Sequence, residues 1–472
     1  SSANSYGATV LNSGTLSIAG TQFLGSGNLY FNGGTLQLTS GTTLTAQAFL
    51  GAAGGVFDVT GSNAVTLSSA LTGSGGLTKL DSGTFILTGA NSYTGNTIIN
   101  GGTLQVGTGG SSGAVPGSSI SVAVNTGSWL VFNRNDNYGG AFNAPITGGG
   151  NLSLAAGSLN LQGTNTFSGS VYVSSNAKLS LYSVLNGSPF SGAIANQGSI
   201  AFTSTYLNTL TGVISGGGSL TQAGSGNLVL SGTNTFTGGL YLNSGSVVIS
   251  SSQNLGASSN PLNFNTGALF ITAGTAIFNP ISISGSGTVG VAANAAATLS
   301  ANIAGAGGSL TTSNTGTLIL SGTNTYGATS LNSGTLSVAS KNSLGSGSLY
   351  FSGGTLQLTG GTTLTAQSLL GTSGGFFDVA ANANLTLSGA ISGSGMLTKI
   401  DSGTLTLSGI TSLTGTMDVT AGTLALTGAG TLTSGSLIIE NAGSVVDLGT
   451  STQTIAALRL AGGSLFNGSL TA

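Results

Sequence analysis

The chain has 472 residues, of which 39% are hydrophobic, 84 are glycine and only 3% are charged, with a formal net charge of −2. Its sequence contains neither histidine nor cysteine, which excludes disulfides, thiolate metal sites and catalysis that depends on histidine. It has five prolines and no continuous repeat of the Gly-x-y triplet, so the glycine content does not indicate collagen. The regular alternation of hydrophobic residues argues against disorder.

The low charge predicts an outer surface of serine, threonine, asparagine and glycine, with weak repulsion between molecules that favours self-association. We expect no nucleic-acid partner, because the six cations are scattered singly: Lys79, Arg134, Lys178, Lys341, Lys399 and Arg459. We also expect no transmembrane segment, since the alanine-rich stretch 289–308 is broken by polar residues.

In chain order, residues 1–72 contain short alternating segments separated by glycine pairs, for example 14–18 and 34–38. The chain begins at Ser1, inside this pattern and without a signal peptide before it. We therefore expect it to be a processed protein or part of a longer one.

The first complete repeat covers residues 73–107. Residues 84–88 alternate with period two, which predicts a strand with Phe85 and Leu87 buried. Clusters of asparagine and glycine then predict tight corners on either side of two further short strands.

Related repeats occur near 148–181, 216–249, 307–338 and 393–426. The residue between the paired inward positions varies, which predicts that it faces outward: Ile86, Asn160, Val229, Ile319 and Thr406. Residues 4–104 also match residues 324–424 without a gap, at a constant shift of 320, and residues 429–472 diverge from the repeat.

All five prolines lie in the region 116–280, at Pro116, Pro145, Pro189, Pro261 and Pro280. This region also holds the only tryptophan, Trp129, and a polar cluster at residues 133–137 that we interpret as a protruding loop.

The repeats predict the architecture. Three short strands and three corners cannot bury an inward face alone, but stacked copies can. No apolar stripe of helical period is present. We therefore predict an all-β, elongated β-solenoid, a right-handed parallel β-helix of about 20 rungs that runs continuously over residues 1–472.

The segments Gly-Gly-Leu-Thr-Lys at 75–79, Gly-Thr-Phe-Ile-Leu-Thr-Gly at 83–89, Asn-Ser-Tyr-Thr-Gly at 91–95 and Asn-Gly-Gly-Thr-Leu at 100–104 are distinctive. Together they resemble the autotransporter-associated β-strand repeat of bacterial passenger domains. The resemblance implies a β-helical, exported protein at the bacterial cell surface or outside the cell.

Catalytic chemistry is hard to place on this sequence. The acidic residues are Asp58, Asp81, Asp136, Asp378, Asp401, Asp418, Glu440 and Asp447. Asp58 with Asp81, or Asp378 with Asp401, could meet on adjacent rungs as a carboxylate pair of a glycan-cleaving enzyme. We instead interpret Lys79 and Asp81 as an exposed ion pair and Asp58 as a turn residue. We assign no catalytic, cofactor-binding or metal-binding residue, and expect no cofactor.

Five aromatic residues mark the corners of the repeats, and we interpret them as packing residues rather than a sugar-stacking ladder: Tyr6, Tyr93, Phe167, Phe236 and Tyr326.

Two functions follow from these patterns. The first is a non-enzymatic extracellular structural or adhesive rod that can self-assemble into a filament or surface layer. Its expected partners are itself, end-to-end or laterally, and surface glycans or host or neighbouring cells. The alternative is a glycan-binding or polysaccharide-active passenger, with a site in the region 116–280 that includes Trp129 or Asp136.

Overall fold

The computed structural model describes residues 4, 6–116, 121–138, 140–185, 189–432 and 435–471. Ser1 lies outside the described residues. Ser5, which belongs to the segment 4–104 that matches residues 324–424, also lies outside them. Within the described ranges the regular elements are β-strands and three short 3₁₀ helices, with no α-helix. The prediction of an all-β, parallel β-solenoid is confirmed, with about 23 turns.

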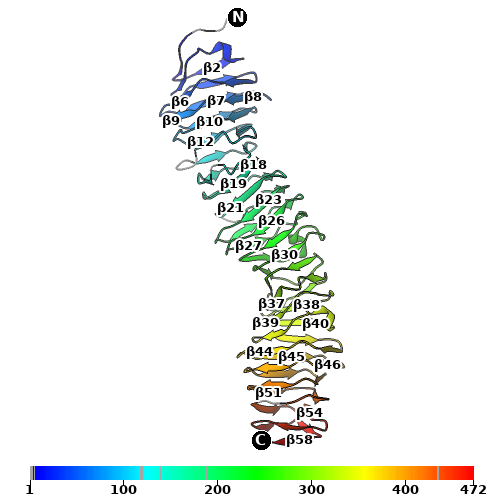
Figure 1. Ribbon diagram of the computed structural model, residues 1–472. Coiled ribbons are helices and arrows are strands. Elements are labelled where there is room, and N and C mark those ends of the chain that lie inside the picture. Colours follow the sequence, from blue (N-terminus) through cyan, green and yellow to red (C-terminus); the bar gives the residue numbers. More distant parts are fainter. Residues whose placement is uncertain are drawn as a thin grey trace. The chain divides into compact units, whose positions relative to one another are not determined.

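The chain divides into two compact units, Ser1–Gly239 and Leu240–Ala472. Figure 1 shows the strands of each unit stacked in successive turns. Continuity of one solenoid through both units, and its right-handed sense, stay predictions.

Three sheets lie wholly in the first unit. The four-stranded sheet has the order β1 (Thr9–Leu11), β3 (Leu29–Phe31), β6 (Ala48–Leu50), β9 (Leu71–Gly73). The seven-stranded sheet consists of β2 (Thr15–Ile18), β4 (Thr35–Leu38), β7 (Gly55–Val59), β10 (Leu77–Leu80), β12 (Thr97–Ile99), β14 (Val122–Val124) and β17 (Ile146–Thr147). The nine-stranded sheet consists of β5 (Thr42–Leu44), β8 (Ala64–Leu67), β11 (Thr84–Leu87), β13 (Thr103–Val106), β15 (Trp129–Asn133), β18 (Asn151–Ala156), β20 (Val171–Val173), β22 (Ile194–Asn196) and β25 (Ile214–Ser215).

Other strands of the first unit pair in two further groups. One group is β16 (Ala141–Phe142), β19 (Ser158–Leu161), β21 (Lys178–Leu181), β23 (Ser199–Phe202) and β26 (Ser219–Gln222). The other is β24 (Asn208–Leu210) with β27 (Asn227–Leu230).

The second unit repeats this arrangement. Its ten-stranded sheet consists of β32 (Thr275–Ile277), β35 (Ala296–Leu299), β38 (Thr317–Leu320), β40 (Thr335–Val338), β42 (Thr355–Leu358), β45 (Gly375–Val379), β48 (Leu397–Ile400), β51 (Thr416–Val419), β53 (Ser436–Ile439) and β56 (Leu458–Leu460). Its six-stranded sheet consists of β43 (Thr362–Leu364), β46 (Asn384–Leu387), β49 (Thr404–Leu407), β52 (Thr423–Leu426), β54 (Val445–Asp447) and β57 (Ser464–Phe466). A two-stranded sheet joins β55 (Thr452–Thr454) and β58 (Ser469–Thr471).

Two further runs of paired strands complete the second unit. The first is β28 (Leu240–Leu242), β30 (Leu262–Phe264), β33 (Ile281–Ile283) and β36 (Ile303–Ala304). The second is β29 (Ser246–Ile249), β31 (Ala268–Ile271), β34 (Ser286–Val291), β37 (Ser309–Ser313), β39 (Thr329–Leu331), β41 (Leu349–Phe351), β44 (Ser368–Leu370), β47 (Ile391–Gly393) and β50 (Thr411–Leu413).

Each strand pairs in parallel with the strand one turn later. Leu16 faces Leu36, and Ile18 faces Leu38, so similar residues stack in register along a sheet. A regular turn contains three strands, such as β3, β4 and β5, one on each of three sheets. This stacking satisfies the backbone groups of each strand through the neighbouring turns.

The inward positions form the core as predicted. Phe85 and Leu87 are fully buried, and Ile86 between them is half-buried. The corner-packing prediction is confirmed for Tyr93, Phe167, Phe236 and Tyr326, which are buried, whereas Tyr6 is 41% exposed.

Three phenylalanine rings from three sheets and three successive turns stack inside the first unit. The ring centroids of Phe31 and Phe57 lie 4.8 Å apart, and those of Phe57 and Phe85 lie 4.4 Å apart with nearly parallel planes. In the second unit Phe351 and Phe377 form the equivalent pair at 4.9 Å, and Leu405 takes the third place.

The corner after β10 requires a left-handed residue, and the sequence places an aspartate there rather than a glycine. Asp81 has a φ of 61°, and its carboxylate accepts a hydrogen bond from the Ser82 backbone amide at 2.6 Å. Asp401 repeats this geometry with a φ of 63°. Local hydrogen bonding of this kind offsets the conformational cost.

Candidate binding grooves

Three 3₁₀ helices interrupt the regular turns: η1 (Thr21–Phe23), η2 (Ser252–Leu255) and η3 (Lys341–Ser343). At the end of each 3₁₀ helix a leucine side chain is buried in the core, and a glycine follows it in the sequence. These leucines are Leu24, Leu255 and Leu344. Exposed polar side chains of these helices are Gln22, Gln253, Lys341 and Asn342, whereas Asn254 and Ser343 are buried. A groove lies between each helix and the loop of the next turn.

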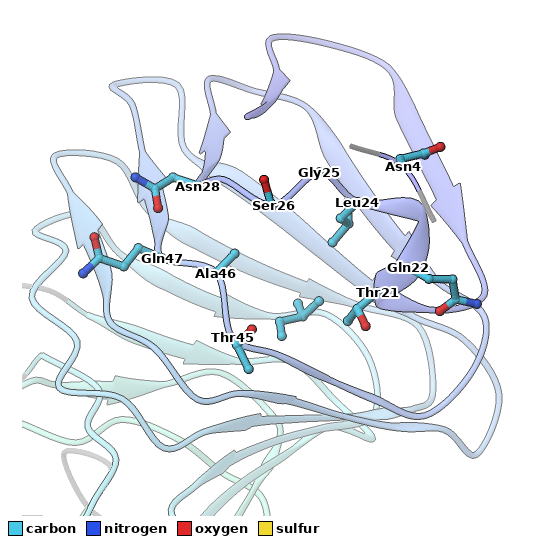
Figure 2. A pocket seen from close by; sticks show the side chains of 11 residues that line it. Asn4, Thr21, Gln22, Leu24, Gly25, Ser26, Asn28, Thr45, Ala46 and Gln47 are labelled. Atoms are coloured by element: carbon cyan, nitrogen blue, oxygen red, sulfur yellow. The ribbon is translucent and has the colours of Figure 1, made fainter. Parts of the chain in front are cut away.

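Groove 1 lies beside η1 and has a volume of about 460 Å³. Figure 2 shows Asn28 and Gln47 at one end of it and Asn4 and Gln22 at the other. The described residues of its lining carry amides and hydroxyls but no charged group. The lining residues are Asn4, Thr21, Gln22, Leu24, Gly25, Ser26, Asn28, Leu44, Thr45, Ala46 and Gln47.

Groove 3 lies beside η3, has a volume of about 310 Å³ and is built by nearly the same positions 320 residues later. The chemical difference is at the helix start, where Lys341 replaces Thr21 and gives this groove a positive charge. Its lining residues are Thr323, Asn324, Lys341, Asn342, Leu344, Gly345, Ser346, Leu349, Leu364, Thr365 and Ala366.

Groove 2 lies beside η2 and is the smallest, at about 130 Å³. It is lined by Ser252, Gln253, Gly256, Ser258, Phe278 and Asn279. Phe278 directly follows β32, at the position that Thr45 occupies after β5 and Thr365 after β43.

Two lysines occupy the core of the solenoid. Lys79 on β10 is fully buried, and its Nζ donates to the carbonyl oxygens of Leu80, Asp81 and Gly101 at 2.6, 2.8 and 3.3 Å. These carbonyls belong to two successive corners, so the ammonium uses all three donors to join them. Burial lowers the pKa of Lys79 to about 8, while Asp81 and Asp58 act in the opposite direction.

Lys399 reproduces this arrangement in the second unit. Its Nζ donates to the carbonyl oxygens of Ile400, Asp401 and Ala421 at 2.9, 2.7 and 3.1 Å. The prediction of an exposed Lys79–Asp81 ion pair is therefore wrong. The lysine shares the inward phase of Leu77, and it meets the backbone carbonyl of Asp81 inside the corner rather than its carboxylate outside.

The two candidate carboxylates are engaged separately. Asp58 lies on β7 rather than at a turn, and its Oδ2 accepts a hydrogen bond from the Gln37 amide at 2.8 Å. Gln37 in turn accepts from Ser17, which makes a polar ladder over three successive rungs. Asp378 accepts from Gln357 in the same way. Asp81 caps its own turn, so each carboxylate has a local structural role.

The polar cluster at 133–137 does not protrude as predicted. Arg134 and Asp136 form an ion pair at 2.6 Å with side chains only 12% and 30% exposed, and the guanidinium lies 5.0 Å from the Tyr138 ring centroid. The hydrogen bond from Arg134 holds the pKa of Asp136 below its usual range. Trp129 is half-buried on β15 between Thr103 and Asn151. Arg134 also donates to the carbonyl oxygen of Gly113 and Tyr138 to that of Val115, 21 and 23 residues earlier, which holds the charged part of the cluster on the solenoid while Asn135 and Asn137 are exposed.

Across the described residues, no group of three or more acidic side chains is placed to hold a metal ion. The same residues contain no helix long and apolar enough to cross a membrane.

The sequence reasoning missed all three grooves. A usable signal was present, because a Leu-Gly pair follows η1 and η3 and spans the end of η2. Such a pair predicts a buried anchor and a tight turn, but the groove itself depends on the loop of the following turn.

The comparisons with known proteins agree with the fold. Five segments match the family described as Passenger-associated-transport-repeat, at residues 77–106, 156–175, 220–249, 310–338 and 397–426. The chain is 32% identical over 471 residues to the Adhesin BmaC autotransporter of Brucella suis biovar 1 (strain 1330). That match covers 89% of this chain and 12% of the relative. No solved structure matches the chain. The resemblance to autotransporter passenger repeats is confirmed.

Proposed function

We propose that this chain, a parallel β-solenoid that carries passenger-associated-transport repeats, is a stretch of an extracellular adhesive passenger displayed at a bacterial cell surface. The observation that carries the proposal is the similarity to the Brucella adhesin along 89% of the chain. The chain spans only 12% of that relative, so its share of the adhesive surface has to be tested on the chain itself.

We also propose that the role is non-enzymatic. The sequence has no histidine, and the carboxylates considered for catalysis are hydrogen-bonded within the solenoid. Glycan cleavage would require two carboxylates facing a common substrate. The Asp58 carboxylate is held by Gln37 and the Asp81 carboxylate by its own turn.

The purified chain, coupled to fluorescent beads, is expected to retain the beads on cultured epithelial cells. Many copies on each bead raise the avidity, so retention should exceed that of control beads by roughly tenfold or more. The control beads carry the same chain after irreversible unfolding. Equal retention of both bead types would refute an adhesive role for this stretch.

Self-assembly is a second candidate, which the low charge of the chain favours. Charged residues make up 3% of the chain, and the formal net charge is −2. A surface with so few charges opposes side-by-side association of chains only weakly.

Light scattering should therefore give an average mass that rises with protein concentration. A monomeric mass for the unmodified chain at high concentration would exclude assembly.

A further inference from the structure

Phe278 presents an aromatic ring at the rim of groove 2. Its side chain is 62% exposed, more than that of any other phenylalanine among the described residues. A single exposed apolar side chain is ordinary on a protein surface. Its position beside polar groups of a groove is what gives it meaning, because the equivalent loops carry threonine at Thr45 and Thr365.

The polar groups beside this ring are available to a ligand. Gln253 and Ser258 are exposed, and within the described part of the chain their side chains make no hydrogen bond to protein. None of the described residues that line the groove is charged. An amide and a hydroxyl can each donate and accept, which suits a ligand rich in hydroxyl groups.

Buried amides fix the frame around the groove. Asn279 donates to the carbonyl oxygens of Ala257 and Asn260, both at 2.9 Å. Asn260 donates to the Leu255 carbonyl at 2.8 Å. These bonds tie the loop that carries Phe278 to the chain after η2, so the ring is presented on a fixed element.

The start of η2 is fixed in the same way. The Asn254 side chain accepts hydrogen bonds from the backbone amides of Ser250 and Ser251 at 3.1 and 3.0 Å, and the Ser251 hydroxyl caps the helix at Gln253. These hydrogen bonds fix the backbone position of Gln253 within η2, and its side chain is exposed to solvent.

We propose that groove 2 binds an uncharged saccharide, with the apolar face of one sugar ring against Phe278 and its hydroxyls bonded to Gln253 and Ser258. This inference rests on the proposed adhesive function and names its ligand class. Sites that combine an aromatic surface with a few placed polar groups bind through both. An acidic glycan would need a cationic partner, which groove 2 lacks and groove 3 has in Lys341.

The size of the groove sets the strength of binding. At about 130 Å³ it is well below the volume of sites that enclose a small molecule, about 300 Å³ and more. A single site is therefore expected to bind in the millimolar range, about 1 mM. Binding to a surface would depend on many displayed copies acting together.

The test uses the full chain on beads against a printed panel of neutral oligosaccharides with terminal glucose, galactose, mannose or N-acetylglucosamine, together with sialylated and sulfated ones. We expect binding to at least one neutral glycan. Phe278→Ala should reduce it by about tenfold, and Phe278→Tyr should retain it. Tyr206→Ala is the matched control, because Tyr206 is 64% exposed and lines none of the three grooves.

The inference is overturned if no neutral glycan binds, if only acidic glycans bind, or if Phe278→Ala binds as well as the unmodified chain. Cell retention separates this failure from that of the proposed function. Beads that still adhere to cells without binding neutral glycans would leave the adhesive role intact and remove the saccharide. An unchanged melting curve for Phe278→Ala verifies that the variant is folded.

Discussion

Lys79→Met is expected to lower the local free energy of unfolding around residues 77–106 by about 3 kcal/mol. The substitution keeps the length and apolar stem of the side chain but removes an ammonium that donates to three carbonyl oxygens in two successive corners. Charge-assisted hydrogen bonds are the stronger kind, and the carbonyls would be left buried without this donor. Hydrogen exchange of peptides from this segment measures the loss locally, which suits a repeat protein whose turns open in parts.

Lys178→Met is the matched control, because Lys178 is exposed on β21 and should change stability by less than about 0.5 kcal/mol. Lys399→Met should reproduce the Lys79 effect around residues 397–426, since its three acceptors are equivalent. Hydrogen exchange that is equally unaffected in Lys79→Met and Lys178→Met would show that the buried ammonium does not stabilise the corner.

Phe57→Ala is expected to cost about 4 kcal/mol in the first unit, the largest effect of any single substitution considered for this chain. Phe57 is fully buried and is the middle ring of three, so its removal leaves a cavity between Phe31 and Phe85. Phe31 and Phe85 lie on strands held in register by parallel pairing, so neighbouring turns cannot collapse into the space without losing that register.

The second unit supplies a comparison that isolates the ring contacts. Phe57→Leu should cost about 1 kcal/mol more than Phe377→Leu, because Phe57 stacks on two rings and Phe377 on one. Both changes are measured by hydrogen exchange of the surrounding strands. Equal costs would mean that the Phe57–Phe85 stack adds nothing beyond buried area.

The regular part of the fold could be read from the sequence. Period-two alternation around Phe85 and Leu87 identified buried faces, and the asparagine and glycine clusters identified corners. Copies of one pattern indicated that each turn is completed by its neighbours. The family resemblance rested on the same residues, and the repeat matches lie on them.

The prediction from the sequence was wrong for the lysines. The alternation that buries Leu77 also buries Lys79, whereas the charge of the lysine favours a position on the surface. Burial of an ammonium is tolerated only when its donors are satisfied. The acceptors that satisfy it include Gly101, 22 residues later, and no local pattern reveals them.

The all-β repeat architecture is predictable because alternation and turn chemistry are local properties that each repeat carries within its own residues. Which polar groups meet depends instead on contacts between successive turns. Groove 2 forms because parallel stacking brings Phe278 beside Gln253 from the preceding turn, and the buried corner forms because the same stacking brings Gly101 beside Lys79. Contacts between turns depend on register, and register is set by the packing of the whole stack rather than by any one repeat.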